Sequence, residues 1–264
     1  MNHNDHSLDL KYGKSSMIRS LAHCLIVCPI IITAALIMLP VEFFIKKILK
    51  LQKVSTIIIP GTIGTFLSKY ITGIEIQLKG LENLQKEGGG CIIASNHEST
   101  IETAILAACT RTEISYVLKQ SLISTPPWNL FYLYFTVIGI DRDKRGVSAI
   151  KSLLGKIKTI LDQGKNLIIF PEGTRVPLGS HKNFKPTVLS LGSSHKVVPV
   201  AHNGATIYGR SFFDPKRKGK VIISFLPAVQ MKENETPKDF TKRVEGCVRQ
   251  EYGILINDNS NYNK

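Results

Sequence analysis

The sequence predicts an α/β domain with a mostly buried sheet flanked by helices, preceded by an N-terminal membrane-associated helical segment. Beyond about residue 75, short β-branched runs alternate with longer amphipathic runs, a pattern typical of an α/β sandwich. Before that point, residues 20–41 include no Asp, Glu, Lys or Arg. We therefore divide the chain into a membrane-anchoring helical segment at 1–75, a main domain at 76–257 and a frayed polar tail at 258–264.

The uncharged stretch at 20–41 is long enough to cross the hydrocarbon core of a bilayer, although two prolines weaken a straight span. The denser cluster of lysines follows this stretch, so the positive-inside rule favours a main domain on the cytoplasmic face, as in a bacterial inner membrane. The second apolar run, 54–67, is short and broken by Pro60 and Gly61, and we expect it to lie in the interface. The alternative is a pair of amphipathic or buried helices in a soluble protein.

The main domain is expected to alternate strands and helices. Apolar runs rich in β-branched residues and bounded by turn residues predict strands at 91–95, 114–118, 137–140, 166–170, 197–201 and 221–225. Apolar residues at helical spacing predict helices at 101–109, 147–162, 187–194 and 237–252. Pro199 lies inside a predicted strand, which indicates an edge position or a local bulge.

The charge balance restricts the partners. Lys and Arg outnumber Asp and Glu by 34 to 20, which favours anionic partners such as membrane lipid headgroups, phosphorylated substrates, coenzyme A or nucleic acid. The basic residues are scattered and no run interleaves them with aromatic residues, so we expect no nucleic-acid partner. The 5 cysteines lack zinc-ligand spacing, so we expect no metal site and a reducing compartment.

Two separated motifs supply the chemistry. The sequence NHESTIE at 96–102 places the imidazole of His97 five residues before the carboxylate of Glu102, the minimum needed to take a proton from a hydroxyl. The sequence FPEGTR at 170–175 ends a strand in a Pro/Gly turn that carries Arg175, and a guanidinium suits a planar oxyanion such as phosphate. Together the motifs indicate acyl transfer to a phosphorylated alcohol.

With these motifs the chain resembles the glycerolipid acyltransferase family over roughly residues 75 to 230. That family has a His-x4-Asp block, a second block with a lysine near a turn, a Phe-Pro-Glu-Gly-Thr-Arg block and a Val-Pro-Val-like strand. The third block matches residue for residue, whereas Glu102 stands where the family usually has Asp. The resemblance implies transfer of an acyl group from acyl-CoA or acyl-carrier protein to the free sn-2 hydroxyl of lysophosphatidic acid. The product would be phosphatidic acid, made without a cofactor, metal or covalent intermediate.

The resemblance also implies roles for individual residues. His97 is expected to be the general base, and Glu102 to orient its imidazole and stabilise the protonated form. Lys119, in the counterpart of the second block, and Arg175 are expected to bind the substrate phosphate. The residues expected to support the turn and the site are Asn96, Pro171, Glu172, Gly173 and Thr174.

Other interpretations stay open on the sequence alone. Ser99 and Glu102 have the spacing of a helix-capping box, so the carboxylate could serve only the first turn of a helix. Lys119 could be an ordinary solvated lysine, and His202 is either a second base or, as we favour, a structural or solvent-facing histidine. The acceptor could be another lysophospholipid or a lyso-aminolipid. A non-catalytic basic membrane-binding module would be favoured if Glu102 proved unable to reach His97.

Overall fold

The computed structural model describes Phe44, Ile48 and residues 75–87, 89–99, 102–110, 112–124, 136–141, 146–177, 180–204 and 220–260. The predicted apolar stretches at 20–41 and 54–67 lie outside these residues. Among the residues that are described, no helix is both long and apolar enough to cross a membrane.

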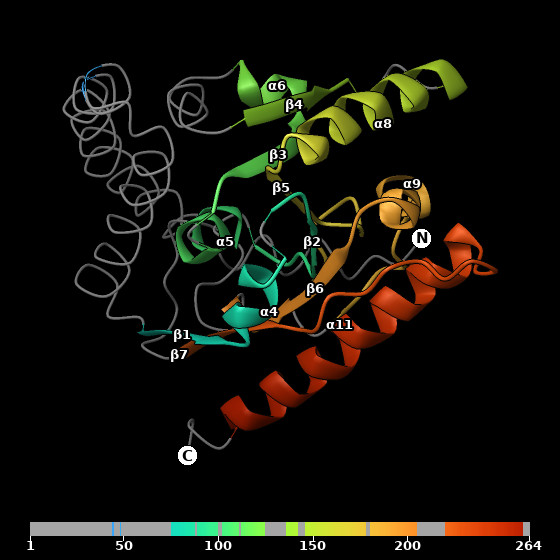
Figure 1. Ribbon diagram of the computed structural model, residues 1–264. Helices are drawn as coiled ribbons and strands as arrows, with labels where there is room; N and C mark the ends of the chain where they lie inside the picture. Colours follow the sequence, from blue (N-terminus) through green and yellow to red (C-terminus); the bar gives the residue numbers. More distant parts are fainter. Residues whose placement is uncertain are drawn as a thin grey trace, which may run out of the picture.

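A seven-stranded sheet forms the middle of the fold, with strand order β1-β7-β6-β2-β5-β3-β4 (Figure 1). All neighbouring strands pair in parallel except β6 and β7, which are antiparallel. The strands are β1 (Glu75–Lys79), β2 (Ile92–Ser95), β3 (Ile114–Lys119), β4 (Thr136–Ile140), β5 (Asn166–Ile169), β6 (Val197–His202) and β7 (Lys220–Phe225). The predicted fold class of an α/β domain with a mostly buried sheet flanked by helices is confirmed for the described residues, and the sheet proves to be mostly parallel.

The two faces of the sheet are covered by different helices, because side chains along each central strand alternate between the faces. On one face, Ile93 packs with residues of α4 (Leu81–Gln85) and α5 (Glu102–Thr110). On the other face, Ile92 packs with residues of α8 (Val147–Asp162), α9 (Pro186–Leu189) and α11 (Pro237–Ser260). Strands β2, β5 and β6 are buried along their whole length, as expected of strands with two covered faces.

Several element bounds differ from those predicted. Strand β1 was not predicted, because its residues alternate between polar and apolar and do not form the continuous apolar run of the central strands, although such alternation suits a strand at the edge of a sheet. The short helix α6 (Gln120–Ile123) was also missed, and the predicted helix at 187–194 is divided between α9 and a 3-10 turn, η1 (Ser190–Ser193).

Pro199 occupies an interior strand, so the predicted edge position is wrong and the predicted bulge is right. Strand β6 lies between β7 and β2, and Pro199 pairs with Ala94 of β2. Val197 pairs with Val229, and Val200 pairs with Phe225 at the end of β7. Two residues lie between these positions on β6, whereas three lie between them on the antiparallel segment that follows β7. The extra residue interrupts the ladder beside the proline, which lacks a backbone N–H to donate.

Helix α11 continues past its predicted end at Tyr252 to Ser260. The prediction stopped before Gly253, a poor helix former, although the apolar residues Ile254, Leu255 and Ile256 follow it. Leu255 is fully buried in the core cluster that includes residues of α11. Burial of this leucine holds the added turns against the domain, and the helix continues into the polar residues 257–260, which alone would favour fraying.

Truncation of Leu255 tests this added packing. Leu255→Ala should lower the free energy of unfolding by about 2–5 kcal/mol, because it leaves a cavity in a closed core. The adjacent Ile254 is 48% exposed and provides a matched control. Ile254→Ala should change the free energy of unfolding by no more than about 0.5 kcal/mol. Chemical denaturation of both variants measures the difference, and equal losses would contradict the packing of the last turns of α11.

Candidate functional site

The candidate site lies at the carboxyl edge of the sheet. Strands β2, β5 and β3 are neighbours and run parallel, so the loops that follow them leave from the same edge. His97 follows β2, the 170–175 turn follows β5, and Lys119 ends β3. In parallel α/β sheets this edge is the usual place for ligands, because the loops there converge.

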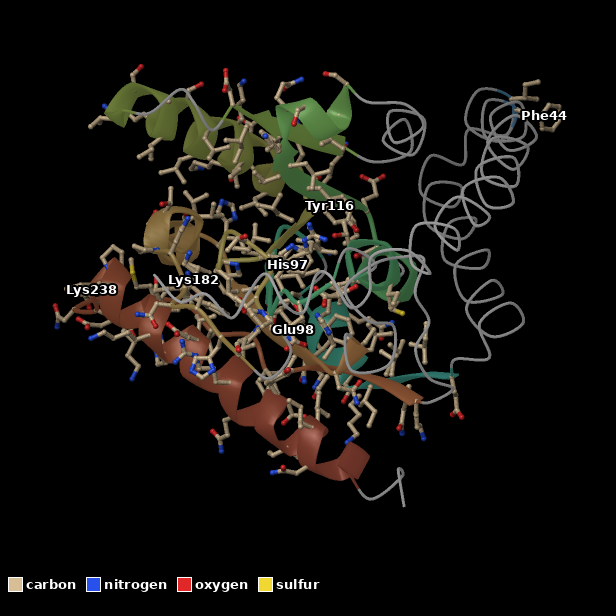
Figure 2. All side chains as sticks on the ribbon, turned by 180° about the vertical axis from the view of Figure 1, so that it is seen from behind. Phe44, His97, Glu98, Tyr116, Lys182 and Lys238 are labelled. Atoms are coloured by element: carbon tan, nitrogen blue, oxygen red, sulfur yellow. The ribbon has the colours of Figure 1, made fainter. Side chains whose placement is uncertain are left out.

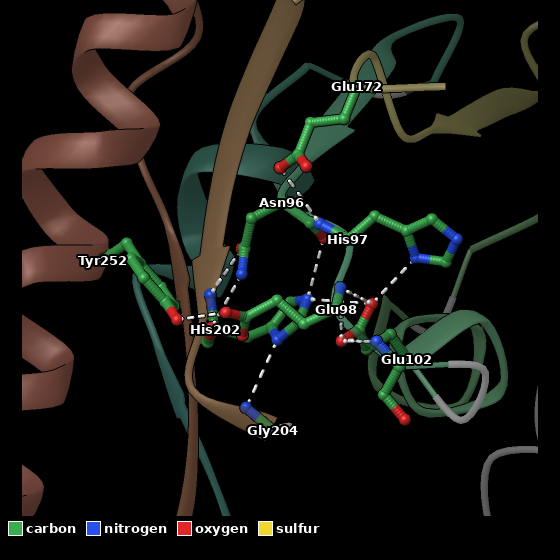
Figure 3. A network of polar contacts seen from close by, with 9 residues as sticks. Asn96, His97, Glu98, Glu102, Glu172, His202, Gly204 and Tyr252 are labelled. Atoms are coloured by element: carbon green, nitrogen blue, oxygen red, sulfur yellow. Dashed lines mark hydrogen bonds and ion pairs between the residues drawn. The ribbon is translucent and has the colours of Figure 1, made fainter. Parts of the chain in front are cut away.

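Asn96 ties the loop after β2 to the end of β6. Its side-chain Nδ2 donates to the carbonyl oxygen of His202 at 3.0 Å, and its Oδ1 accepts from the backbone N–H of His202 at 3.1 Å (Figure 3). The side chain is only 7% exposed, so these two hydrogen bonds satisfy amide groups that water cannot reach. They fix the starting point of the His97 loop.

His97 and Glu102 are in direct contact. The imidazole Nδ1 lies 2.9 Å from Glu102 Oε2, and Glu102 is 2% exposed while the His97 side chain keeps 18% of its surface open (Figure 3). When the Nδ1–H group donates a hydrogen bond to the carboxylate, the lone pair of the neutral imidazole resides on Nε2. The added methylene of glutamate, compared with the aspartate usual in the family, therefore does not prevent the pairing.

Glu102 also closes the first turn of α5. Its Oε1 accepts from the backbone N–H of Ser99 at 2.6 Å, and both carboxylate oxygens lie 3.0 Å from the backbone nitrogen of Glu98. The bond from Ser99 is the contact expected of a capping box. Capping and contact with the histidine are thus two properties of one carboxylate.

The electrostatic environment of Glu102 contains opposing contributions. Burial raises its pKa well above the usual range, and the nearby carboxyl groups of Glu98 and Glu172 act in the same direction. Hydrogen bonds from the N–H groups of Glu98 and Ser99 lower the pKa. Because the carboxyl oxygens face N–H donors and the imidazole, the contacts are those of the ionised form.

The loop after β5 is joined to the His97 loop. The ring of Phe170 stacks on the imidazole of His97, with centroids 4.1 Å apart and planes inclined by 20°. The N–H of Val176 donates to the carbonyl oxygen of His97 at 2.9 Å. These contacts hold Arg175, the residue before Val176, on a backbone that is attached to the histidine loop.

Gly173 makes the tight turn in this loop possible. It adopts φ of 74°, and its N–H donates to the carbonyl oxygen of Phe170 at 2.9 Å. Only glycine adopts this left-handed conformation without strain, so the turn requires it. Thr174 and Arg175 follow on the exposed side, while Pro171 is buried.

Glu172 points inward from the same turn. Its carboxyl is 2% exposed and accepts a long hydrogen bond of 3.4 Å from the backbone N–H of His97 (Figure 3). Burial raises the pKa of Glu172 to about 7, and the carboxyl group of Glu98 contributes in the same direction. The side chain thus acts as a support between the two loops, in contact with the histidine backbone and not with its ring.

The structure brings together the predicted residues of the two motifs, whereas Lys119 lies further away. It is exposed at the end of β3, two strands from β2, which corresponds to about 10 Å across the sheet. A substrate that contacts both His97 and Lys119 must therefore span the loop that follows β5.

His202 is structural. It is 2% exposed, its Nε2 lies 3.1 Å from the carbonyl oxygen of Asn96, and its Nδ1 accepts from the N–H of Gly204 at 3.3 Å. Burial lowers its pKa to about 4, which keeps the ring neutral. Of the favoured interpretations, a structural histidine is consistent with both contacts, and a solvent-facing one is wrong because the side chain is buried.

Two site contacts had no signal in the sequence motifs. The hydroxyl of Tyr252, on α11, donates to Glu98 Oε1, and Glu98 is 1% exposed (Figure 3). Lys185 passes over Gly173 of the turn. Both partners come from segments far along the chain, so spacing within a motif does not reveal them. Among the described residues, no group of three or more His, Cys, Asp or Glu side chains has the geometry of a metal site.

Comparisons with known proteins identify a family to which this part of the chain is similar. Residues 75–203 match the model of the family described as Acyltransferase, a range that includes His97, Glu102, Lys119 and Arg175. Residues 75–203 belong to the acyltransferase family.

Alignments with individual relatives are longer than the match to the family model. The chain is 29% identical over 214 residues to a 1-acyl-sn-glycerol-3-phosphate acyltransferase of Pseudomonas aeruginosa, covering 78% of this chain and 81% of the relative. It is 26% identical over 195 residues to the human 1-acyl-sn-glycerol-3-phosphate acyltransferase beta, covering 71% of this chain and 68% of the relative. The crystal structure of the 1-acyl-sn-glycerophosphate (LPA) acyltransferase PlsC from Thermotoga maritima superposes with a TM-score of 0.68. It has 22% identity and covers 90% of this chain and 95% of that one, which supports the acyltransferase fold.

The buried neutral His202 predicts a pH dependence of stability. Its pKa is about 4 in the folded protein and about 6.5 when unfolded, so the unfolded chain binds the extra proton. This contribution to stability is complete above pH 6.5 and is lost as the pH falls to about 4, by about 3 kcal/mol in total. The unfolding free energies of wild type and His202→Gln are measured from pH 7 to pH 4, and the difference between them should change most in that window. Parallel curves would show that His202 does not titrate between the two states.

Proposed function

We propose that the protein transfers an acyl group from an acyl thioester to the free sn-2 hydroxyl of lysophosphatidic acid and forms phosphatidic acid. The observation that supports this most strongly is the His97–Glu102 contact, joined to the turn that carries Arg175, inside an acyltransferase domain. Relatives that match most of the chain bear the name of this activity. A non-catalytic membrane module would be expected only if Glu102 could not reach His97, and it does reach it.

The pair acts as a general base in the proposed reaction. His97 Nε2 accepts the proton of the acceptor hydroxyl while the hydroxyl oxygen attacks the thioester carbonyl carbon. The tetrahedral intermediate then breaks its carbon–sulfur bond, and the imidazolium returns the proton to the departing thiolate. Glu102 holds the ring by Nδ1 and stabilises its positive charge, as the carboxylate does in hydrolase triads. No covalent enzyme intermediate is needed.

The acceptor phosphate is proposed to bind the exposed cations that follow β5 and β3. Arg175 can engage a phosphate through two parallel N–H bonds, and Lys119 provides a further point charge. Both lie at the edge of the sheet from which His97 emerges. A phosphate held there leaves the glycerol hydroxyl on the side of the imidazole, which is the orientation that the reaction requires.

The donor and the location belong to the same proposal. Acyl-CoA and acyl-carrier protein both present a thioester on an anionic carrier, and the excess of basic residues suits either one. Since acceptor and product are lipids, we infer that the domain at 76–257 works at a membrane surface, with segment 1–75 as its anchor. The cytoplasmic face follows from the lysines beyond residue 41.

The proposed base is tested by His97→Ala. Detergent-solubilised protein should convert lysophosphatidic acid and acyl-CoA to phosphatidic acid, and the variant should lower kcat by roughly 10²–10⁴-fold. Its melting temperature should stay close to that of wild type, because the ring lies outside the two core clusters.

His195→Ala is the matched control, since His195 precedes β6 at the opposite edge of the sheet and pairs with Asp162. This variant should keep wild-type turnover. A well-folded His97→Ala protein with comparable activity would overturn the mechanism. Wild-type protein that acylates other lysophospholipids and not lysophosphatidic acid would overturn the choice of acceptor.

A further inference from the structure

A lysine outside both motifs lies directly over the 170–175 turn. A Cβ atom added at Gly173 would lie 2.8 Å from Lys185 Nζ, 3.1 Å from its Cε and 3.4 Å from its Cδ. The far half of the lysine side chain therefore runs across the backbone of the turn, although the residue as a whole is exposed. Its ammonium group lies on the turn that supplies Arg175.

The backbone that presents Lys185 is held from two sides. Its N–H donates to the carbonyl oxygen of Pro171 at 2.9 Å, which attaches it to the turn. The preceding Phe184 is 7% exposed in the core, and its N–H donates to Glu245 Oε2 of α11 at 3.2 Å. Pro186 then begins α9. The position of the lysine is thus fixed by the core, by α11 and by the turn.

No carboxylate among the described residues neutralises the charge of Lys185. In the part of the chain that the structure describes, its Nζ has no carboxylate within ion-pair distance. The acidic residue of the turn, Glu172, points inward to the backbone of His97. An accessible ammonium group that lies on the turn that also carries Arg175 is suited to an anion with more than one negative charge.

We propose that Lys185 is a third cation of the acceptor site and selects a terminal phosphomonoester over a phosphodiester. This inference rests on the proposed function. A phosphomonoester is dianionic near neutral pH and has three terminal oxygens, so it can accept hydrogen bonds from Arg175 and Lys185 at the same time. A phosphodiester has one charge and only two such oxygens, and its second substituent occupies the space beside the turn. The lysine therefore distinguishes lysophosphatidic acid from lysophospholipids with larger headgroups.

The first test measures binding without turnover. Glycerol 3-phosphate is titrated into the full-length protein by calorimetry, with wild type, Lys185→Gln, Lys185→Arg and Lys182→Gln. Lys182 is the matched control, because it is an exposed lysine on the same segment (Figure 2). Lys185→Gln should weaken binding about 10- to 100-fold, the equivalent of one hydrogen bond to a charged group. Lys185→Arg should retain most of the affinity, and Lys182→Gln should match wild type.

The second test separates headgroups. For Lys185→Gln, KM for lysophosphatidic acid should rise by a similar factor while kcat changes little, and kcat/KM for lysophosphatidylglycerol, a phosphodiester, should stay within about twofold. Unchanged glycerol 3-phosphate binding by Lys185→Gln, an equal loss in Lys182→Gln, or no saturable binding by wild type would overturn the inference. Binding that depends on Lys185 in a wild-type protein that does not acylate lysophosphatidic acid would contradict the proposed function and leave the phosphate contact supported.

Discussion

The buried carboxylate of Glu102 is the contact on which the geometry of the site depends. It accepts hydrogen bonds from the backbone N–H groups of Glu98 and Ser99, and it also contacts Nδ1 of His97. Without it, two N–H groups at the start of α5 would lose their partners in a place closed to water, and the imidazole would lose its orientation. The same interaction therefore begins a helix, shapes a loop and sets the tautomer of the proposed base.

The rest of the site is built outward from this loop along one edge of the sheet. Asn96 anchors the loop to the end of β6, while Phe170 and Val176 join it to the loop after β5. Because β2, β5 and β3 are parallel neighbours, three loops from distant parts of the sequence meet there. Burial of Glu98, Glu102 and Glu172 so close together is unfavourable for ionised carboxylates. The N–H donors and the tyrosine hydroxyl offset part of this cost, while Oε2 of Glu172 accepts no hydrogen bond from the described residues.

The sequence predicted the parts of the fold that local patterns determine. Central strands such as β2 and β5 are continuous apolar runs, and the contact between His97 and Glu102 follows from a spacing of five residues. It did not predict β1, whose polar residues belong to an edge strand, or the end of α11, which depends on burial of Leu255. Lys185 and Tyr252 were missed because tertiary contacts bring them to the site, and a single sequence contains no pattern for such contacts. Apart from Phe44 and Ile48, the segment before β1 lies outside the described residues, so its role as an anchor stays a prediction.

The central claim, that Glu102 acts through His97, is tested most directly by a double-mutant cycle on kcat. Turnover of lysophosphatidic acid would be measured for wild type, His97→Ala, Glu102→Gln and the double variant. Glu102→Gln can still accept the backbone hydrogen bonds at the start of α5 but cannot stabilise an imidazolium charge, so it should lower kcat on its own. In the absence of His97 the same substitution should have no further effect, so the double variant should be as slow as His97→Ala. Losses that multiply in the double variant would show that Glu102 acts independently of His97 and would contradict the pairing as the basis of catalysis.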